Sequence, residues 1–546
     1  MSKILRIGMA QINPVLGDLE GNSGKIIGLI KDAAEKGVDL IIFPELAITG
    51  YPPQDLIFNN NFVSENIKAL NKIAANSCDD IVIVIGFIDK SEDGLYNAAS
   101  VIQNGSIIGK RYKTLLPNYD VFDELRYFLP SKTNSPVSLV IKDKKLALGI
   151  EICEDLWDAN SEIKVTDNLA SQGCNIIVNL SASPFAEEKR KIREKLIQEK
   201  VRKWKVPFIY VNMVGGQDEL VFDGNSLGYD ADGKVVGWGG EFINSFNIFD
   251  LNITTGLGKA ITLPDVDCEE IVYNALVLGT RDYLQKSGFS KAVIGLSGGI
   301  DSALVACIAT HALGAENVLC IIMPSRFTSS QSIRDAKKLA NSLKVEYKVI
   351  SIEEIVWSYE KNLSEIFLSL PRDITEENIQ ARVRGNILMA VSNKFKHIVL
   401  STGNKTELAL GYCTLYGDMT GGLAVISDIS KSGVYALSNY VNRKAVREII
   451  PQNIINRTPS AELAEKQVDP FDYKIVSPLV DYIVKDGKSQ RELIEMGFSE
   501  ELVKDISRRI RSAEYKRRQA VPGIKITQKA FGIGRRFPIV NHFHER

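Results

Sequence analysis

Histidine is scarce in this sequence, and the scarcity limits the chemistry available to its first half. Only four histidines occur in 546 residues: His311, His397, His542 and His544. A Ser–His or Cys–His pair needs histidine as its general base. Because no histidine precedes position 311, we expect any nucleophile in the first half to use a different base.

Paired cysteines and long apolar runs are also missing. The seven cysteines are scattered, odd in number and free of Cys-x-x-Cys spacing. This pattern predicts a reducing, cytoplasmic setting without disulfides or structural zinc. The first residues lack the apolar run of a signal peptide, and no stretch approaches the ~18 apolar residues of a membrane span. We therefore expect neither secretion nor a membrane partner.

The chain carries no strong excess of charge. Lys and Arg number 66 against 67 Asp and Glu, a formal net charge of −1. No overall charge therefore favours nucleic acid or a membrane surface, and we expect neither as a partner. The hydrophobic share of 45% and the charged share of 24% are typical of a globular enzyme. The length predicts about two to four domains.

The first half alternates short apolar runs with amphipathic stretches. The dipeptide Asn104-Gly105, within 100–112, indicates a tight β-hairpin. Hairpins mixed with helices predict a layered α/β fold whose sheets are covered by helices. Strands are expected at 4–12, 39–45, 81–88, 146–153, 175–183 and 207–214, and helices at 21–37, 61–77 and 186–205.

The second half has a different pattern, which begins after a weakly patterned stretch at 240–268. Helices are expected at 268–287, from 301 and at 329–343, and strands at 291–297, 317–324 and 345–352. This alternation predicts a doubly wound, Rossmann-like parallel sheet with a ligand crevice beyond the carboxyl ends of its strands. We divide the chain into domains at 1–255 and 268–546, joined by a linker at 256–267.

A glycine-rich loop, GLSGGIDS, links the first strand of the second half to a helix. Such a loop can close around an anion with its backbone amides and the helix N-terminus. It is neither a Walker A loop nor a GxGxxG loop, and a plain tight turn would explain a glycine pair alone. The full string resembles the SGGxDS pyrophosphate loop of the N-type ATP pyrophosphatases. That resemblance implies ATP binding by Gly295, Leu296, Ser297, Gly298, Gly299, Ile300, Asp301 and Ser302.

Five later segments narrow the resemblance to NAD synthetase domains, which amidate deamido-NAD (nicotinic acid adenine dinucleotide). In order along the chain they are MPSRFTSSQSIRDAKKLANSL (323–343), ENIQARVRGNIL (377–388), STGNKTELALGYCTLYGDMTGG (401–422), SDISKSGVYAL (427–437) and AEYKRRQAVPGIKI (513–526). The resemblance implies that Thr402 lies near ATP and that Asn378, Glu407 and Lys516 contact deamido-NAD. It also implies Mg²⁺ ligation by Asp301 and Glu407, whose oxygen donors suit a hard cation. Lys431 and Ser460 match ATP-contacting positions of related synthetases.

Three segments of the first half resemble the Glu–Lys–Cys triad of the nitrilase superfamily, in order and in local motif. FPELAITGY (43–51) supplies Glu45, RYKTLLPNY (111–119) supplies Lys113, and GIEICEDLW (149–157) supplies Cys153. In such a triad cysteine forms a thioester with an amide substrate, glutamate moves the protons and lysine stabilises the oxyanion. No histidine is needed. The resemblance implies an α-β-β-α sandwich for this half.

The surroundings of Cys153 raise a difficulty. Glu151, Glu154 and Asp155 flank it, and acids disfavour the reactive thiolate. The sequence assigns these three acids no role. The resemblance further suggests Glu124 as a second, supporting glutamate, and it implies glutamine contacts by Tyr119, Ser183 and Lys189. Lys189 follows Ala186-Glu187-Glu188, where the family has a small or histidine-containing stretch.

An amidase fused to a synthetase resembles the family of glutamine-dependent NAD synthetases over essentially the whole chain. The resemblance implies that glutamine is hydrolysed to glutamate and ammonia in the first half. In the second half, ATP with Mg²⁺ would adenylate deamido-NAD, releasing pyrophosphate. Ammonia would then displace AMP to give NAD. The resemblance also implies a protected passage for ammonia and a homo-oligomer.

Other functions stay open at this point. Another glutamine-dependent ATP pyrophosphatase amidotransferase is one, although a GMP synthetase should carry a Cys–His–Glu glutaminase. An asparagine synthetase should have cysteine directly after the initiator methionine, where this chain has Ser2. An inactive first domain that serves as a scaffold should lack a triad residue. A nitrilase with an ATP-sensing domain leaves the segments after 323 unexplained.

Overall fold

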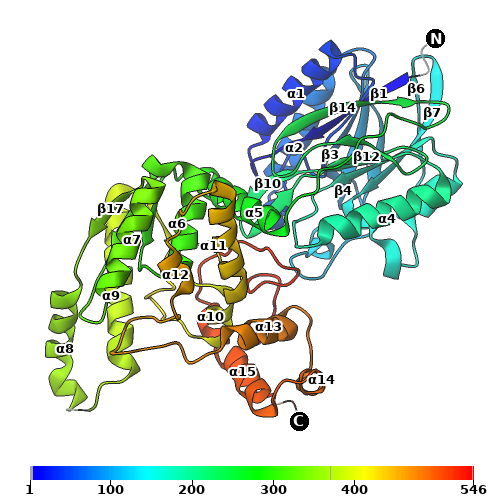
Figure 1. Cartoon of the computed structure of the whole chain (residues 1–546). Coiled ribbons are helices and arrows are strands. Elements are labelled where there is room, and N and C mark those ends of the chain that lie inside the picture. Colours follow the sequence, from blue (N-terminus) through cyan, green and yellow to red (C-terminus); the bar gives the residue numbers. More distant parts are fainter. Residues whose placement is uncertain (1–3, 369, 544, 546) are drawn as a thin grey trace. The chain divides into compact units, whose positions relative to one another are not determined.

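Two units with different sheet architectures make up the chain, and the computed structural model describes residues 4–368, 370–543 and 545 (Figure 1). The first unit comprises Met1–Gln217 and Val221–Asp265. The second comprises Asp218–Leu220 and Val266–Arg546. Each unit has its own sheets, helices and buried core.

The first unit is built on two six-stranded sheets. In each sheet three central strands run parallel and the outer strands pair antiparallel. A short hairpin adds β10 (Val214–Gln217) and β11 (Leu220–Asp223). One sheet has the order β14 (Ser245–Asn252), β1 (Ile4–Gln11), β2 (Leu40–Ile42), β3 (Val82–Lys90), β4 (Leu95–Gln103) and β5 (Ser106–Tyr112). The other has the order β13 (Val235–Trp238), β12 (Leu227–Tyr229), β9 (Phe208–Asn212), β8 (Ile176–Ser181), β7 (Lys144–Ile152) and β6 (Val137–Ile141).

Helices cover the outer face of each sheet. Successive side chains of a strand point to opposite faces of its sheet, so one set packs in the core between the two sheets and the other set packs against the helices. In β8, Ile176 and Val178 lie in the core between the sheets, while Ile177 packs with the helices outside. α1 (Leu19–Glu35) and α2 (Asn60–Ala75) contribute to the outer core of the first sheet. α3 (Val165–Ser171) and α4 (Lys189–Trp204) do the same for the second (Figure 1). The expected α-β-β-α sandwich is confirmed.

The second unit contains one five-stranded sheet in which every pairing is parallel. Its order is β17 (Glu346–Val349), β16 (Val318–Ile322), β15 (Ala292–Gly295), β18 (Ile398–Ser401) and β19 (Leu423–Ala424). α8 (Glu353–Phe367) and α9 (Ile374–Phe395) share a core with one face, to which Val293 contributes. α6 (Ile300–Leu313) also packs on β15 and β16. The expected doubly wound sheet is confirmed.

The remaining helices of this unit surround the sheet or follow it in the chain. They are α5 (Cys268–Lys286), α7 (Ser330–Leu343), α10 (Lys405–Leu410), α11 (Lys431–Ala445) and α12 (Gln452–Asn456). A last group is α13 (Tyr473–Val484), α14 (Gln490–Glu495), α15 (Glu500–Ser512) and α16 (Glu514–Arg517). α13, α14 and α15 share one apolar core with α10. The helices α13, α14, α15 and α16 were not predicted from the sequence.

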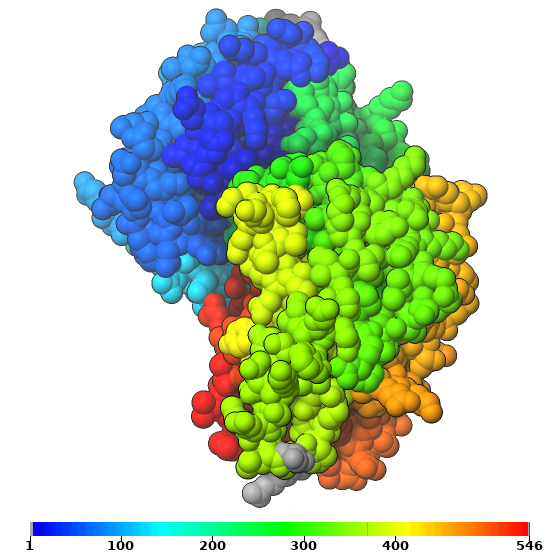
Figure 2. Space-filling model, turned by 90° about the vertical axis from the view of Figure 1, so that its left-hand side faces the viewer, coloured from blue at the N-terminus to red at the C-terminus, as the bar shows by residue number. Residues whose placement is uncertain are grey.

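Part of the second unit's surface is formed by α8 and α9, which include the yellow-green residues of Figure 2. α8 buries only Val356, so most of its side chains are accessible to solvent. Within the described residues, no helix combines the length and the hydropathy that crossing a membrane requires.

Alanine substitutions at two glycines of the first unit should change its stability in opposite directions. A Cβ on Gly86, in β3, would lie 2.4 Å from the Leu46 nitrogen and 2.7 Å from the Glu45 Cα. Gly86→Ala should therefore destabilise the unit by about 1–3 kcal/mol through overpacking. Gly24→Ala, on α1 with open space around it, should stabilise it by up to ~1 kcal/mol. The midpoint temperature of thermal unfolding would measure both effects. A midpoint for Gly86→Ala that equals or exceeds that of the wild type would contradict the packing argument.

Candidate active sites

The thiol of Cys153 lies at the carboxyl end of a central strand of the first unit. Cys153 directly follows β7 and opens a short 3₁₀ turn, η3 (Cys153–Leu156). Ser183 comes two residues after β8, which pairs with β7 in parallel. The carboxyl ends of parallel strands meet at one edge of a sheet, so both residues lie at that edge. Cys153 is only 5% exposed and has a φ of +46°, a left-handed conformation that is uncommon for a residue other than glycine.

A buried lysine lies between two buried glutamates in the same unit. The Lys113 Nζ atom is 2.7 Å from Glu45 Oε1 and 2.8 Å from Glu124 Oε1. None of these three side chains is more than 5% exposed. Glu45 follows β2, and Lys113 follows β5. The fold thus brings together three charged residues that are far apart in the sequence.

Neutral donors fix the two glutamates. The Asn97 side chain donates to Glu45 Oε1 at 2.7 Å and to Glu124 Oε2 at 3.4 Å. The Ala182 N–H donates to Glu45 Oε2 at 2.8 Å, and the Tyr51 hydroxyl donates to Glu124 Oε1 at 2.9 Å. Neither Asn97 nor Tyr51 was predicted from the sequence as part of the site. Tyr51 at least ends the motif FPELAITGY, whereas nothing in the sequence distinguishes Asn97.

The electrostatics of this cluster keep the lysine charged and the thiol protonated at neutral pH. Burial, followed by the negative charge of Glu45, raises the pKa of Cys153 well above its ordinary value, and Lys113 opposes that rise. Burial would lower the pKa of Lys113, but Glu124 and Glu45 outweigh it and raise this pKa. Burial likewise raises the pKa of Glu124. A thiol with this raised pKa would need a base to accept its proton before it could act as a nucleophile.

The acids that flank Cys153 are each bound to other groups. Burial raises the pKa of Glu151 to about 8, and Asn179 and Thr166 donate to its carboxylate. Burial also raises the pKa of Asp155 to about 7, against the effect of backbone N–H donors. The structure thus distinguishes these acids by their hydrogen-bond donors, which the sequence does not reveal.

Two of the three predicted glutamine contacts, Tyr119 and Lys189, lie around the third flanking acid, Glu154. The Tyr119 hydroxyl donates to the Glu154 carboxylate at 3.0 and 3.1 Å, although the Tyr119 residue is 55% exposed. Both Lys113 and Lys189 act electrostatically on Glu154, whose pKa burial raises. Lys189 also donates to the Pro184 carbonyl oxygen at 3.0 Å. Tyr119 and Lys189 therefore lie near the residue that follows Cys153.

The loop between β15 and α6 in the second unit is closed by its own hydroxyl groups. Ser297 Oγ is 3.1 Å from Ser302 Oγ and accepts the Gly299 N–H at 3.2 Å. Gly298 has a φ of +82°, and a Cβ there would lie 2.4 Å from the Ser332 carbonyl oxygen. This position therefore requires glycine. The N-terminus of α6 follows at once and favours an anion.

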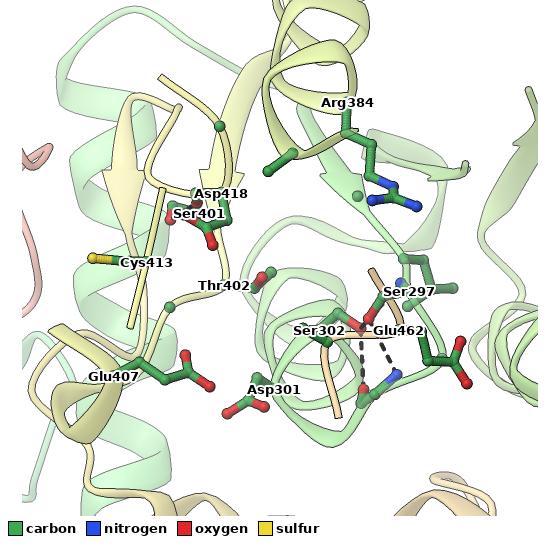
Figure 3. A pocket seen from close by; sticks show the side chains of 18 of the residues that line it. Ser297, Asp301, Ser302, Arg384, Ser401, Thr402, Glu407, Cys413, Asp418 and Glu462 are labelled. Atoms are coloured by element: carbon green, nitrogen blue, oxygen red, sulfur yellow. Dashed lines mark hydrogen bonds between the residues drawn. The ribbon is translucent and has the colours of Figure 1, made fainter. Parts of the chain in front are cut away.

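A pocket of about 310 Å³ lies at this loop (Figure 3). Lys431 connects two of its carboxylates: the Lys431 Nζ atom is 2.5 Å from Asp301 Oδ2 and 3.5 Å from Glu407 Oε1. Figure 3 shows the Asp301 and Glu407 side chains close together, with Thr402 nearby. The predicted residues that line the pocket are Gly295 through Ser302, Thr402, Glu407, Lys431 and Ser460.

The charged groups in the pocket shift one another's pKa values. Burial, and then the negative charge of Asp301, raise the pKa of Glu407 to about 8, while Lys431 opposes the rise. Burial would lower the pKa of Lys431, but Asp301 and Glu407 outweigh it and raise this pKa. Lys431 therefore stays a cation that offsets the repulsion between the two acids.

Two predicted residues, Asn378 and Lys516, are not among those that line the pocket. The Lys516 Nζ atom donates to the carbonyl oxygens of Gly411 and Cys413, each at 2.8 Å. The Asn378 side-chain oxygen accepts the Thr414 hydroxyl at 2.6 Å. Both residues therefore hold the segment 411–414, which contributes Tyr412 and Cys413 to the pocket lining.

Polar residues that contact the 295–302 loop and were not predicted from the sequence include Asn404 and Arg457. Asn404 donates to Asp301 Oδ1 at 2.8 Å and forms a reciprocal capping box with Glu407 at the start of α10. The spacing of Asn404 and Glu407 in GNKTE could have revealed this box. Arg457 donates to the Ser332 hydroxyl at 2.6 Å and to the Gly298 carbonyl oxygen at 3.4 Å.

Family comparisons cover both halves of the chain. The model of the carbon-nitrogen hydrolase family matches residues 6–254, and that of the NAD synthase family matches residues 272–520.

Known proteins match the chain from end to end. A glutamine-dependent NAD(+) synthetase of Synechocystis sp. is 43% identical, over 98% of this chain and 99% of that protein. One from Thermotoga maritima is 42% identical over the full length of both. A solved glutamine-dependent NAD+ synthetase of Acinetobacter baumannii, in complex with adenosine diphosphate, is 37% identical. It has a TM-score of 0.79 and covers 98% of this chain and 99% of its own.

The charge of Lys113 should control the reactivity of the Cys153 thiol. Because Lys113 lowers the pKa of this thiol, Lys113→Gln should raise it and leave less thiolate at any given pH. One pKa unit corresponds to a tenfold change in thiolate, so we expect alkylation by iodoacetamide at pH 8 to slow about tenfold or more.

Mass spectrometry of the peptide that contains Cys153 would measure this rate between pH 7 and 10. Lys142→Gln is the matched control, since Lys142 pairs with Asp39 in the same unit. Unchanged alkylation in Lys113→Gln would show that the lysine does not act on the thiol.

Proposed function

The chain belongs to the family of glutamine-dependent NAD(+) synthetases, and from this premise we propose that it amidates deamido-NAD to NAD with ammonia from glutamine. The reaction uses ATP and releases AMP, pyrophosphate and glutamate. One observation carries the proposal: each unit places a lysine between two carboxylates, in the first unit where its charge acts on Cys153 and in the second at the GLSGGIDS loop.

The first half hydrolyses glutamine through Cys153. Glu45 accepts the thiol proton, and the sulfur attacks the amide carbon of glutamine to form a tetrahedral intermediate. The Lys113 cation stabilises the oxyanion of this intermediate. Glu45 then donates the proton to the leaving ammonia, and a thioester remains. Glu45 then deprotonates a water molecule that attacks the thioester, the C–S bond breaks to release glutamate, and Glu45 returns the proton to the Cys153 thiolate.

The surrounding residues support these roles. Ala182 and Asn97 fix the Glu45 carboxylate, so its orientation is set before substrate arrives. We assign Glu124 to holding Lys113 from the other side. Tyr119, Ser183 and Lys189 would hold the amino acid portion of glutamine, a role supported by the position of Tyr119 and Lys189 near Glu154.

The second half activates the carboxylate of deamido-NAD. We propose that the 295–302 loop binds the phosphates of ATP through its backbone amides and the N-terminus of α6, with Thr402, Lys431 and Ser460 also near ATP. A nicotinate carboxylate oxygen attacks the α-phosphorus, pyrophosphate leaves, and ammonia then displaces AMP. Asn378, Glu407 and Lys516 are assigned to deamido-NAD, with Asn378 and Lys516 bracing residues 411–414 beside the pocket.

Asp301 and Glu407 suit a magnesium ion that is bound together with ATP. Both carboxylates line the pocket, and oxygen ligands fit a hard cation. In the described part of the chain, no group of three or more His, Cys, Asp or Glu side chains could hold a metal alone. Mg²⁺ commonly uses one or two carboxylates and completes its coordination with phosphate oxygens and water. Bound there, the ion would neutralise charge on the phosphates.

Further assignments follow from the family resemblance. We propose that residues 1–255 form the glutaminase and residues 268–546 the synthetase, joined by 256–267. This division is supported by the family matches at 6–254 and 272–520. A cytoplasmic location, a homo-oligomer and a protected passage for ammonia stay predictions. The alternative of another glutamine-dependent amidotransferase is not favoured, because the full-length relatives are NAD synthetases.

Removing the proposed nucleophile should abolish NAD formation from glutamine but not NAD formation from ammonium. In Cys153→Ala, NAD formation supported by glutamine should fall about a thousandfold or more, because no thioester can form. Formation supported by ammonium should be largely unchanged. An assay of NAD and AMP with ATP, deamido-NAD and either nitrogen donor would measure both.

Cys174→Ala, which removes another buried thiol of the same unit, should leave both activities in place. Glutamine-supported synthesis in Cys153→Ala at the wild-type rate would refute the triad.

Removing the proposed phosphate-loop acid should instead stop both reactions that yield NAD. Asp301→Ala should lower synthesis from glutamine and from ammonium about a hundredfold or more, since both need activated deamido-NAD. The same product assay would detect the loss. Asp282→Ala, a buried acid on α5 outside the pocket lining, is the control. Wild-type synthesis in Asp301→Ala would refute the proposed role of the loop.

A further inference from the structure

Asp155, two residues after Cys153, holds two segments of the first unit with one carboxylate. Its Oδ1 atom accepts the N–H groups of Thr114 at 2.9 Å and Leu115 at 2.8 Å. Its Oδ2 atom accepts the N–H group of Ile152 at 2.9 Å. The residue is 1% exposed, so water cannot easily replace these donors. Asp155 therefore joins the segment that follows Lys113 to the residue that precedes Cys153.

The backbone at Cys153 needs such support. Its φ of +46° lies in a region that residues other than glycine seldom adopt. Such a conformation persists only where contacts with the surrounding structure hold the backbone in it. Asp155 fixes the N–H group just before Cys153, and Asn179 donates to the Cys153 carbonyl oxygen at 3.4 Å. The backbone is thus held on both sides of the thiol-bearing Cα atom.

We propose that Asp155 is a positioning residue for glutamine hydrolysis, which sets the separation of the Lys113 ammonium and the Cys153 thiol by binding the backbone beside each. This inference rests on the proposed function. The side chain itself touches neither glutamine nor the reacting atoms in the proposed reaction. It acts through two residues that do.

The chemistry of the carboxylate explains why aspartate suits this position. Three N–H donors approach it from two segments, and both of its oxygens accept. An asparagine side chain accepts only through its oxygen, so its NH₂ group would face an N–H donor on one side. Glutamate would retain both acceptors but would move them by the length of one methylene group. Either change should shift Lys113 relative to Cys153.

The test compares Asp155→Asn with Asp158→Asn in the full-length enzyme. Asp158 is also a buried acid of this region, but its carboxylate pairs with Lys200 on α4 at 3.0 and 2.8 Å. Glutamate release with saturating ATP and deamido-NAD gives kcat and KM for glutamine. We expect Asp155→Asn to lower kcat about a hundredfold, because a shift of about 1 Å can cost that much. KM should change less than about threefold.

NAD formation from ammonium should stay at the wild-type rate in both variants. Asp158→Asn should also keep the wild-type kcat for glutamine hydrolysis. A wild-type kcat in Asp155→Asn, or an equal loss in Asp158→Asn, would overturn the inference. If Asp155→Asn does not fold, Asp155→Glu decides the question: a kcat at least about tenfold lower supports the inference, and a wild-type kcat overturns it.

Cys153→Ala, assayed in parallel, separates this inference from the proposed function. An inactive Cys153→Ala with a fully active Asp155→Asn would overturn only the positioning role. An active Cys153→Ala would overturn the proposed function together with the inference that rests on it.

Discussion

The first unit depends on the burial of Lys113 between Glu45 and Glu124. An unpaired charge in an apolar interior is very costly, and a buried ion pair is tolerated only when its remaining polar atoms are also satisfied. The segments after β2 and β5 must therefore meet Glu124 in the folded chain. Asn97, Tyr51 and the Ala182 N–H then occupy further acceptor positions of the two glutamates. Burial alone would lower the pKa of Lys113, and the negative charges of Glu124 and Glu45 are what keep the lysine a cation that acts on the thiol.

The second unit uses a similar arrangement with greater access to solvent. Lys431 lies between Asp301 and Glu407, but these carboxylates are 17% and 19% exposed, compared with 0% for Glu45. The difference follows from the architecture. Both clusters follow the carboxyl ends of parallel strands, but the first is buried among hydrogen-bond donors such as Asn97 and Tyr51, whereas the second lines a pocket of about 310 Å³.

Much of the fold could be predicted because it is encoded in local patterns. The turn at Asn104-Gly105 does join β4 to β5, and both residues have positive φ values of 50° and 75°. Other features had no such signal. The helices α13, α14 and α15 are short and share their core with α10, some 60 to 100 positions earlier in the sequence. Nothing in the segment 471–512 alone indicates that partner, because it is supplied by tertiary packing.

The sequence by itself determined the chemical groups available: a cysteine, a glutamate and a lysine in nitrilase-like motifs, a loop built for an anion, and no histidine in the first half. Only the tertiary structure decided what each acid beside Cys153 does. Glu151, Glu154 and Asp155 are equivalent in the string GIEICEDLW, yet they bind different donors. The physical reason is that burial and hydrogen-bond partners control a carboxylate, and both depend on residues far away in the chain.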